Sequence, residues 1–320
     1  MTDTPDRGAS DDTVPGADRA QLLRCAEWTR DQQADPIGTA ASAARFLLVE
    51  WPLPWPSHIE DVEALEPLLG IAARTRTRVQ LVAPRPGREG RELVLHHRPD
   101  RSGFAGFERR TVEVASAEVV AIASDLLEDP AIGEPTPGES DVLVCSHGRR
   151  DACCGSMGTI LAVALAAAVP DVDGIVHVRR TSHTGGHRFA PTAVFLPTGT
   201  VWAYCDEELV ERVLRRAGDV RDVLDRYRGS AALGSPVEQA VERAVFADVG
   251  WGWLDWSRTV GQRSDGSVRV TGVAPDGVQR CWDGRAEPGR VLAVPECRHP
   301  IAEAKKSSTE VHVTSLERVE

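Results

Sequence analysis

Apolar residues recur along the first third of the chain in short segments that polar, Pro-rich and Gly-rich stretches separate. Clustered or alternating β-branched residues indicate strands, and apolar residues three or four positions apart indicate helices. We expect these elements, in order, at residues 44–51 (strand), 59–73 (helix), 78–83, 92–97 and 111–114 (strands) and 116–127 (helix). The order is therefore strand, helix, three strands, helix.

The middle third of the chain repeats this order. We expect its elements at residues 141–145 (strand), 157–169 (helix), 174–178, 192–196 and 200–204 (strands) and 207–216 (helix). The repeat lies in the order of the elements and shows no obvious residue identity. Because each half would pack helices against a mixed sheet, we predict an α/β (mixed-sheet α+β) fold of two tandem thioredoxin-like domains, at residues 19–135 and 136–228.

The two ends of the chain have a different composition. Residues 1–18 are polar and predict a disordered tail, and the first ordered element is expected as a helix at 21–33. Residues 235–320 predict a small C-terminal module of one helix and several hairpins. Its turns are expected at three Asp-Gly pairs, which favour a positive φ: Asp265-Gly266, Asp276-Gly277 and Asp283-Gly284.

Charge and hydropathy exclude several classes of protein. The formal net charge of -11 and the pI near 5.4 disfavour nucleic acid and anionic membrane surfaces as partners. The arginines at positions 74, 76 and 78 are interpreted as a solvated face. No apolar run is long enough to span a bilayer and no secretory signal is visible, so a cytoplasmic location is expected. The sequence does not indicate the oligomeric state.

Seven cysteines are an odd number for a chain without a secretory signal. A reducing compartment would keep them as thiols unless a metal binds them. Three of them, Cys145, Cys153 and Cys154, form the only cluster along the sequence. The other four are scattered and are interpreted as small apolar residues: Cys25, Cys205, Cys281 and Cys297.

Two motifs carry candidate chemistry: Cys145-Ser-His-Gly-Arg-Arg-Asp-Ala-Cys-Cys154-Gly and His183-Thr-Gly-Gly-His187. Cys145 is expected at the end of a strand and Cys154 at the start of a helix, where the helix dipole favours a thiolate. Two glycines between the histidines allow both imidazoles to converge. Two thiolates and two imidazoles fit either tetrahedral zinc or a [2Fe–2S] cluster. Eight residues separate the two cysteines, which favours an extended cluster without excluding zinc.

Both motifs resemble signatures of the sucrase/ferredoxin-like proteins, which run roughly Cys-Thr-His-Gly-x-Arg-Asp-x-x-Cys-Gly and His-x-Gly-Gly-His-x-x-Ala. The resemblance covers about residues 25–216. It implies a thioredoxin-like ferredoxin that holds a [2Fe–2S] cluster by Cys145, Cys154, His183 and His187. Cys153 falls on a position that the signature leaves free, so it competes with Cys154 as a ligand or is an additional thiol beside the site.

Other residues of the motifs are expected beside the ligands rather than as ligands. These are His147, Arg150, Asp151, Cys153, Gly185, Gly186 and Arg188. Arg149 and Arg150 are expected to pair with an acid near the site, and Arg188 to lie beside it or face solvent. Three tryptophans near the motifs are interpreted as core residues: Trp51, Trp55 and Trp202.

The predicted function is electron transfer between the [2Fe–2S] cluster and an unidentified redox protein partner. The chain is expected to be an electron carrier rather than an enzyme with a substrate of its own. No nucleotide-binding fingerprint follows a strand, so the electrons are expected to come from another molecule. One alternative is a metal-free thiol reductase that uses Cys153 or Cys154. Another is a structural zinc module for protein interaction. No carboxylate pair indicates a glycosidase.

Overall fold

The computed structural model describes residues 24–99, 103–167 and 174–319. The tail predicted at residues 1–18 lies outside this part. The first described element is helix α1 (Cys25–Asp31), which is shorter than the helix expected at 21–33. None of the helices in the described part is both long and apolar enough to cross a membrane.

The first half of the chain has the predicted order of elements. They are β1 (Arg45–Glu50), α2 (Glu66–Arg74), β2 (Thr77–Val82), β3 (Arg91–His97), β4 (Glu108–Val114), α3 (Val119–Glu128) and the short β5 (Glu134–Pro135). The helix expected from residue 59 is correct only in its second part. Two 3-10 turns, Ile59–Asp61 and Glu63–Leu65, come first, and α2 begins where a proline occupies its first turn.

The second half repeats the order, as predicted. It contains β6 (Glu139–Cys145), a π-helical turn (Cys154–Gly158), α4 (Thr159–Ala167), β7 (Ile175–Thr181), β8 (Ala193–Leu196), β9 (Thr200–Trp202), α5 (Glu207–Arg215) and β10 (Tyr227–Ser230). Further 3-10 turns lie at Pro130–Ile132, His187–Phe189, Val220–Asp222, Leu224–Arg226, Trp251–Asp255 and Ile301–Glu303.

The two halves join in one ten-stranded mixed sheet of order β10-β9-β8-β6-β7-β2-β1-β3-β4-β5. In each half the first strand pairs in parallel with the second and antiparallel with the third. The halves meet where β2 and β7 pair antiparallel, at Val82 and Thr181. Glu50 pairs with Val82, and Cys145 pairs with Thr181. Glu50 and Cys145 thus hold equivalent places in the two halves.

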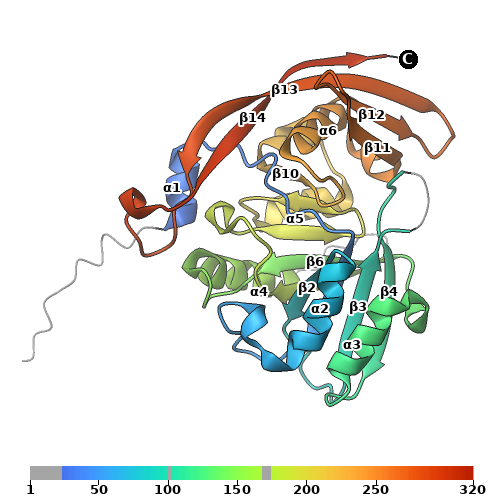
Figure 1. Ribbon diagram of the computed structural model, residues 1–320, viewed down its shortest axis with the longest axis vertical. Helices are drawn as coiled ribbons and strands as arrows, with labels where there is room; N and C mark the ends of the chain where they lie inside the picture. The colour runs from blue at the N-terminus through green and yellow to red at the C-terminus, as the bar shows by residue number, and fades with distance from the viewer. Residues whose placement is uncertain (1–23, 100–102, 168–173, 320) are drawn as a thin grey trace, which may run out of the picture.

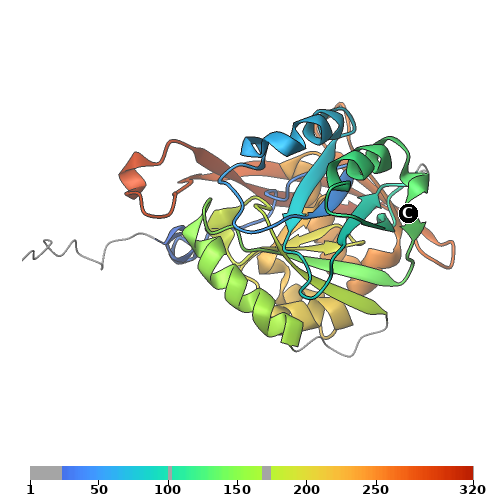
Figure 2. The ribbon, with the colours of Figure 1, turned by 90° about the horizontal axis from the view of Figure 1, so that it is seen from below.

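Alternating side chains of the central strands enter different layers of the core. On β1, Leu47 and Val49 pack with the apolar faces of α2 and α3. Phe46 and Leu48, from the opposite face of β1, pack with Leu143 of the second half. The two parts of the sheet therefore share an apolar layer between them. Figure 2 shows α2 and α3 on one side of the molecule and α4 on the other.

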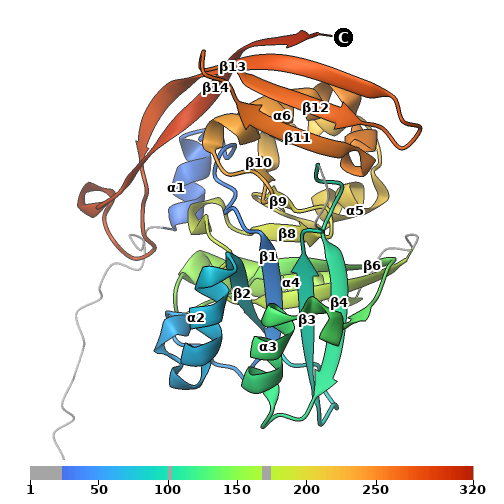
Figure 3. The same ribbon diagram turned by 45° about the vertical axis from the view of Figure 1, so that its right-hand side comes forward.

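The C-terminal segment forms the predicted helix with hairpins. Helix α6 (Pro236–Val249) begins with a capping box at Ser235, and the strands β11 (Ser257–Gln262), β12 (Val268–Val273), β13 (Gln279–Ala293) and β14 (Ser307–Arg318) make a four-stranded antiparallel sheet. This sheet curves over α6 (Figure 3). Both pack into the same apolar core as α4 and α5.

The Asp-Gly pairs form two of the three expected turns. Asp265-Gly266 lies between β11 and β12, and Asp276-Gly277 lies between β12 and β13. The expectation of a turn at Asp283-Gly284 was wrong, because this pair lies within β13. A Cβ at Gly284 would lie 2.5 Å from a side-chain atom of Val241, so this glycine allows α6 to approach the sheet.

The long hairpin β13–β14 reaches back to the N-terminal helix α1, as Figure 1 shows. Arg290 of β13 donates hydrogen bonds to the carbonyl oxygens of Gln32 and Gln33, at 3.1 and 2.8 Å. Glu310 of β14 accepts a hydrogen bond of 2.9 Å from the backbone N–H of Asp35. The loop end of this hairpin therefore lies beside α1, whereas β14 ends at the opposite end of the hairpin, where Arg318 pairs with Trp282.

Candidate metal centre

Two parallel strands carry the two motifs to the same edge of the sheet. β6 ends at Cys145, which lies opposite Thr181 at the end of β7. The loop with His183 and His187 follows β7 directly. Because the carboxyl ends of parallel neighbours lie at one edge, the cysteine loop and the histidine loop leave the sheet together.

Cys145 and Cys154 are buried and interact through their side chains. A hydrogen bond with Cys154 is the main cause that lowers the pKa of the Cys145 thiol; burial opposes it, and the nearby His183 imidazole lowers the pKa further. The same bond, and then burial, raises the pKa of Cys154. The two side chains thus shift each other in opposite directions, and their interaction favours the thiolate form of Cys145 over that of Cys154.

Glycines bring Cys154 against Cys145. Cys154 begins the π-helical turn before α4, an irregularity that is frequent at functional sites. A Cβ at Gly158 would lie 1.9 Å from the carbonyl oxygen of Cys145, and a Cβ at Gly155 would lie 2.2 Å from the Cα of Gly148. The turn can pack directly on the loop after β6 only because both positions have no side chain.

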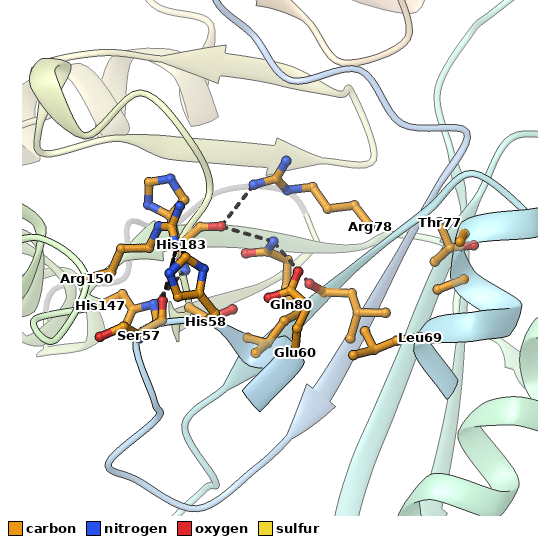
Figure 4. Close-up of a pocket in the computed structure, with 15 residues that line it drawn as sticks. Ser57, His58, Glu60, Leu69, Thr77, Arg78, Gln80, His147, Arg150 and His183 are labelled. Atoms are coloured by element: carbon orange, nitrogen blue, oxygen red, sulfur yellow. Dashed lines mark hydrogen bonds between the residues drawn. The ribbon is translucent and has the colours of Figure 1, made fainter. Parts of the chain in front are cut away.

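His183 is held through its backbone, while its ring keeps a free nitrogen (Figure 4). Its carbonyl oxygen accepts hydrogen bonds from Arg78 at 2.9 Å and from Gln80 at 3.4 Å. Its backbone N–H donates to Nδ1 of His147 at 3.3 Å, and Nε2 of His147 lies 2.7 Å from the carbonyl oxygen of Pro56. Nδ1 of His183 is buried and has no hydrogen-bond partner.

Both ring nitrogens of His147 are therefore used by backbone groups. Burial lowers the pKa of His147, so the ring is neutral and accepts at Nδ1 while it donates at Nε2. Trp55 packs edge-on against this ring with 5.8 Å between ring centroids. His147 therefore supports the histidine loop and lies beside the candidate ligands, as expected from the sequence.

Asp151 positions His187 and Cys154 together. Its Oδ2 lies 3.0 Å from Nδ1 of His187, and its Oδ1 accepts a 3.1 Å hydrogen bond from the backbone N–H of Cys154. With Nδ1 bonded in this way, Nε2 is the nitrogen that His187 offers to a metal. The rings of His183 and His187 lie 6.1 Å apart between centroids.

The Gly-Gly pair between the histidines has the conformational role that the sequence predicts. Gly185 and Gly186 have φ values of 89° and 72°, which side chains rarely adopt. Arg228, which is buried, donates a 3.0 Å hydrogen bond to the carbonyl oxygen of Gly185. A Cβ at Gly186 would lie 2.2 Å from the guanidinium of Arg228. Arg228 could not be recognised from the sequence, since an arginine in a strand carries no signal of a role at a distant loop.

Three thiols, from Cys25, Cys153 and Cys297, meet next to this site. Cys25 lies on α1, Cys153 precedes Cys154, and Cys297 lies in the loop between β13 and β14. The sulfur of Cys153 is 3.8 Å from that of Cys25 and 3.1 Å from that of Cys297, and the third pair is 3.3 Å apart. Cys25 is buried and Cys297 is half-buried in an apolar cluster, as predicted, but the two are not scattered in space, because their sulfurs lie beside that of Cys153.

The remaining cysteines behave as expected. Cys205 is buried in the apolar core, and Cys281 on β13 is half-buried, with its sulfur 3.5 Å from the hydroxyl of Thr271. None of the seven cysteines is in a disulfide bond.

Arginines around the site differ from the expectations. Arg78 was placed on a solvated face, but it is half-buried and bonds to the histidine loop. Arg150 is exposed and donates to His58 at 2.6 Å instead of pairing with an acid of the site. Arg188 is buried and lies over the ring of Phe189, 4.7 Å from its centroid. The positive charge near the candidate ligands thus comes from arginines outside the cysteine motif.

A cavity of about 500 Å³ borders His183. It is lined by His147, Arg150, Ser182 and His183 from the motifs and by Arg78 and Gln80 from β2, among others (Figure 4). His183 is half-buried, so its side of the site is reached from this cavity. Trp55 and Trp202 are buried core residues, as predicted, and Trp51 is half-buried.

Comparisons with known proteins agree with the motifs. Residues 36–229 match the sucrase/ferredoxin-like family. The chain is 30% identical over 97 residues to "Altered inheritance of mitochondria protein 32" of Meyerozyma guilliermondii, which covers 28% of this chain and 33% of that protein. The chain thus spans about a third of the length of this curated relative. No solved structure matches the chain.

Proposed function

This chain belongs to the sucrase/ferredoxin-like family, and we propose that it is an electron-transfer protein that holds a [2Fe–2S] cluster by Cys145, Cys154, His183 and His187. The observation that carries this proposal is the unpartnered, buried Nδ1 of His183 beside the interacting pair Cys145 and Cys154. A cluster of this type supplies one-electron oxidation and reduction when it is bound.

Each of the four side chains offers a donor atom that suits iron. The pKa of the Cys145 thiol is lowered, which favours the thiolate form that binds a metal, and metal binding would displace the remaining thiol protons. His183 offers Nδ1, and His187 offers Nε2 because Asp151 bonds its other nitrogen. A carboxylate that bonds the far nitrogen of a histidine is a frequent support of metal ligands.

Residues around the ligands fix their positions and tune the charge. Arg78 and His147 hold the backbone of His183, and Arg228 holds the turn between the histidines. Burial, and then the charges of Arg78 and Arg188, lowers the pKa of Arg228 to about 10, so all three guanidiniums are positive at neutral pH. Their charge offsets that of thiolate ligands, and net charge is one determinant of the reduction potential.

The cavity beside His183 is the side on which we expect electrons to enter or leave. The imidazole borders it, whereas both cysteines are fully buried. A redox protein partner would therefore dock over Arg150, His58 and His183.

We also propose that each half is a thioredoxin-like domain. Support comes from the strand order, β4-β3-β1-β2 in the first half and β9-β8-β6-β7 in the second, with the same parallel and antiparallel pairs.

The metal-free thiol reductase is disfavoured by the state of its two candidate nucleophiles. A hydrogen bond with Cys25 lowers the pKa of Cys153, but a bond with Cys297 and burial outweigh it and raise the pKa to about 11. The pKa of Cys154 is raised as well. A nucleophilic cysteine is favoured by a lowered pKa, and the pKa values of both residues shift in the opposite direction.

The test is anaerobic purification of the full chain followed by visible absorption and analysis of iron and sulfide. We expect a coloured protein with about two irons and two sulfides per chain. Cys145→Ser should lose them, His187→Cys should keep iron with a changed spectrum, and Cys281→Ser serves as the matched control because Cys281 lies on β13, away from the site. A colourless wild type after anaerobic reconstitution would refute the proposal.

A further inference from the structure

Beside the four candidate ligands lies a second group of metal-binding side chains. The three thiols of Cys25, Cys153 and Cys297 surround the carboxylate of Asp151, and the four potential ligand atoms all lie within 4.8 Å of one another. Oδ2 of Asp151 is 3.6 Å from the sulfur of Cys25, and Oδ1 is 3.7 Å from the sulfur of Cys297. None of these three cysteines belongs to the ligand set proposed above.

Ordinary packing does not account for this group. Asp151 is 5% exposed, and its carboxylate already bonds to His187 and to the backbone N–H of Cys154. It does not need the three thiols, which are weak hydrogen-bond donors, as partners, so hydrogen bonding does not explain why they gather around it. The sulfur separations of 3.1 to 3.8 Å also exceed the bond length of about 2.05 Å in a disulfide, and three thiols cannot all pair with one another.

We propose that Cys25, Cys153, Cys297 and Asp151 form a second metal site, specific for a zinc ion. Zinc binds thiolates at about 2.3 Å and carboxylate oxygens at about 2.0–2.2 Å, most often as a tetrahedron of four protein ligands. Tetrahedral geometry then places two sulfurs about 3.8 Å apart. Cys25 and Cys153 already have this separation, 3.8 Å.

The sulfur of Cys297 is the one that has to move outward slightly, from 3.1 and 3.3 Å. It lies in a loop and is half-buried, so a small movement meets little resistance. Three thiolates select zinc, copper(I) or iron–sulfur clusters, and the hard carboxylate oxygen in fourth position favours zinc among them.

Asp151 connects the two sites. One of its oxygens lies 3.0 Å from Nδ1 of His187, while both oxygens face the three thiols. A zinc ion bound there fastens α1 and the loop between β13 and β14 to the cysteine motif. With four protein ligands, this would be a closed, structural site. Because Cys25 and Cys297 are 272 positions apart in the chain, it would link two distant segments beside the candidate electron-transfer site.

The experiment measures zinc and iron per chain in the anaerobically purified full-length protein, and then titrates it with Zn²⁺. We expect about one zinc per chain in the wild type, in addition to the irons of the first site. Cys25→Ser and Cys297→Ser should each weaken zinc binding by at least about tenfold, the smallest loss seen even for residues that only support a metal ligand. Both variants should keep their iron and visible absorption.

Two variants separate the two proposals. Cys145→Ser should lose iron but keep zinc, and Cys281→Ser, the matched control, should keep both. Two outcomes would overturn the second site, whatever the iron content. One is zinc binding that is unchanged in Cys297→Ser. The other is zinc binding that is lost in Cys145→Ser but kept in Cys25→Ser. A wild type without zinc after titration would also overturn it.

Cobalt(II) gives a test that needs no variant. Added to the wild type in place of zinc, it should show intense thiolate-to-cobalt charge-transfer absorption and the ligand-field bands of a tetrahedral ion. The weak absorption of octahedral cobalt would show that no thiolate site of this kind is present, even if a cysteine variant fails to fold.

Discussion

Replacing Gly158 by alanine tests whether direct backbone contact holds the two cysteines together. The added Cβ would lie 1.9 Å from the carbonyl oxygen of Cys145, whereas ordinary contacts begin at 3.4 Å. The turn and the loop after β6 must therefore separate by about 1.5 Å, the difference of these two distances. Overpacking of this kind costs about 1–3 kcal/mol, and we expect the upper end because both atoms belong to or adjoin the backbone.

The assay is thermal unfolding of the full chain, with iron content as a second measurement. A loss of about 3 kcal/mol lowers the Tm by roughly 6 °C in a large domain. The matched control is Gly70→Ala in α2, where a Cβ meets nothing within 4 Å. Alanine there should raise stability by about 0.5–1 kcal/mol through helix propensity. If Gly158→Ala unfolds at or above the wild-type temperature, the contact argument is wrong.

Three further substitutions probe the surroundings of the site. His147→Leu leaves the N–H of His183 and the carbonyl oxygen of Pro56 unpaired, at up to about 1–3 kcal/mol each, which denaturant unfolding should show as a lower midpoint. Asp141→Asn breaks a buried ion network and should cost about 3–5 kcal/mol by the same assay. Burial raises the pKa of Asp141, but the hydrogen bond with His96, and then the charges of His96, Arg179 and Arg109, outweigh burial and hold the pKa below its usual range. The wild-type contribution is therefore present above about pH 4 and lost as the pH falls further, a loss that Asp141→Asn should not show. Gly186→Ala forces a Cβ into the guanidinium of Arg228 and should destabilise more than the matched Gly185→Ala, whose nearest neighbour is 3.8 Å away; equal effects would contradict this.

The repeated order of elements could be predicted from the sequence because it depends on local patterns. Strands β1 and β6 are apolar runs, and α2 and α4 have helical spacing, so neighbouring residues carry enough information. The joining of both halves in one sheet could not be predicted in this way. It depends on a short pairing between β2 and β7, at Val82 and Thr181, which are distant in the chain.

The same distinction applies to the candidate site. Cys145, Cys154 and the two histidines lie in two compact motifs, and the strands β6 and β7 bring those motifs to one edge. Cys25 and Cys297 gave no signal, because no spacing rule relates residues 272 positions apart. The turn predicted at Gly284 was wrong. The sequence does not distinguish a glycine that allows a helix to pack closely from a glycine that forms a turn.

The equivalence of Glu50 and Cys145 has a consequence for how the protein would respond to loss of the proposed cluster. Glu50, at the end of β1, pairs with Arg85 at 3.3 Å and accepts a 2.9 Å hydrogen bond from the backbone of Glu92, so an ion network closes that end of the first half. The first half thus builds the same strand order with salt bridges where the second half has thiols. A chelator should therefore loosen the loops at the edge of the second half and leave the ten strands assembled. Amide hydrogen exchange should then become fast at residues 146–154 and 182–187 and stay slow in β1 and β6.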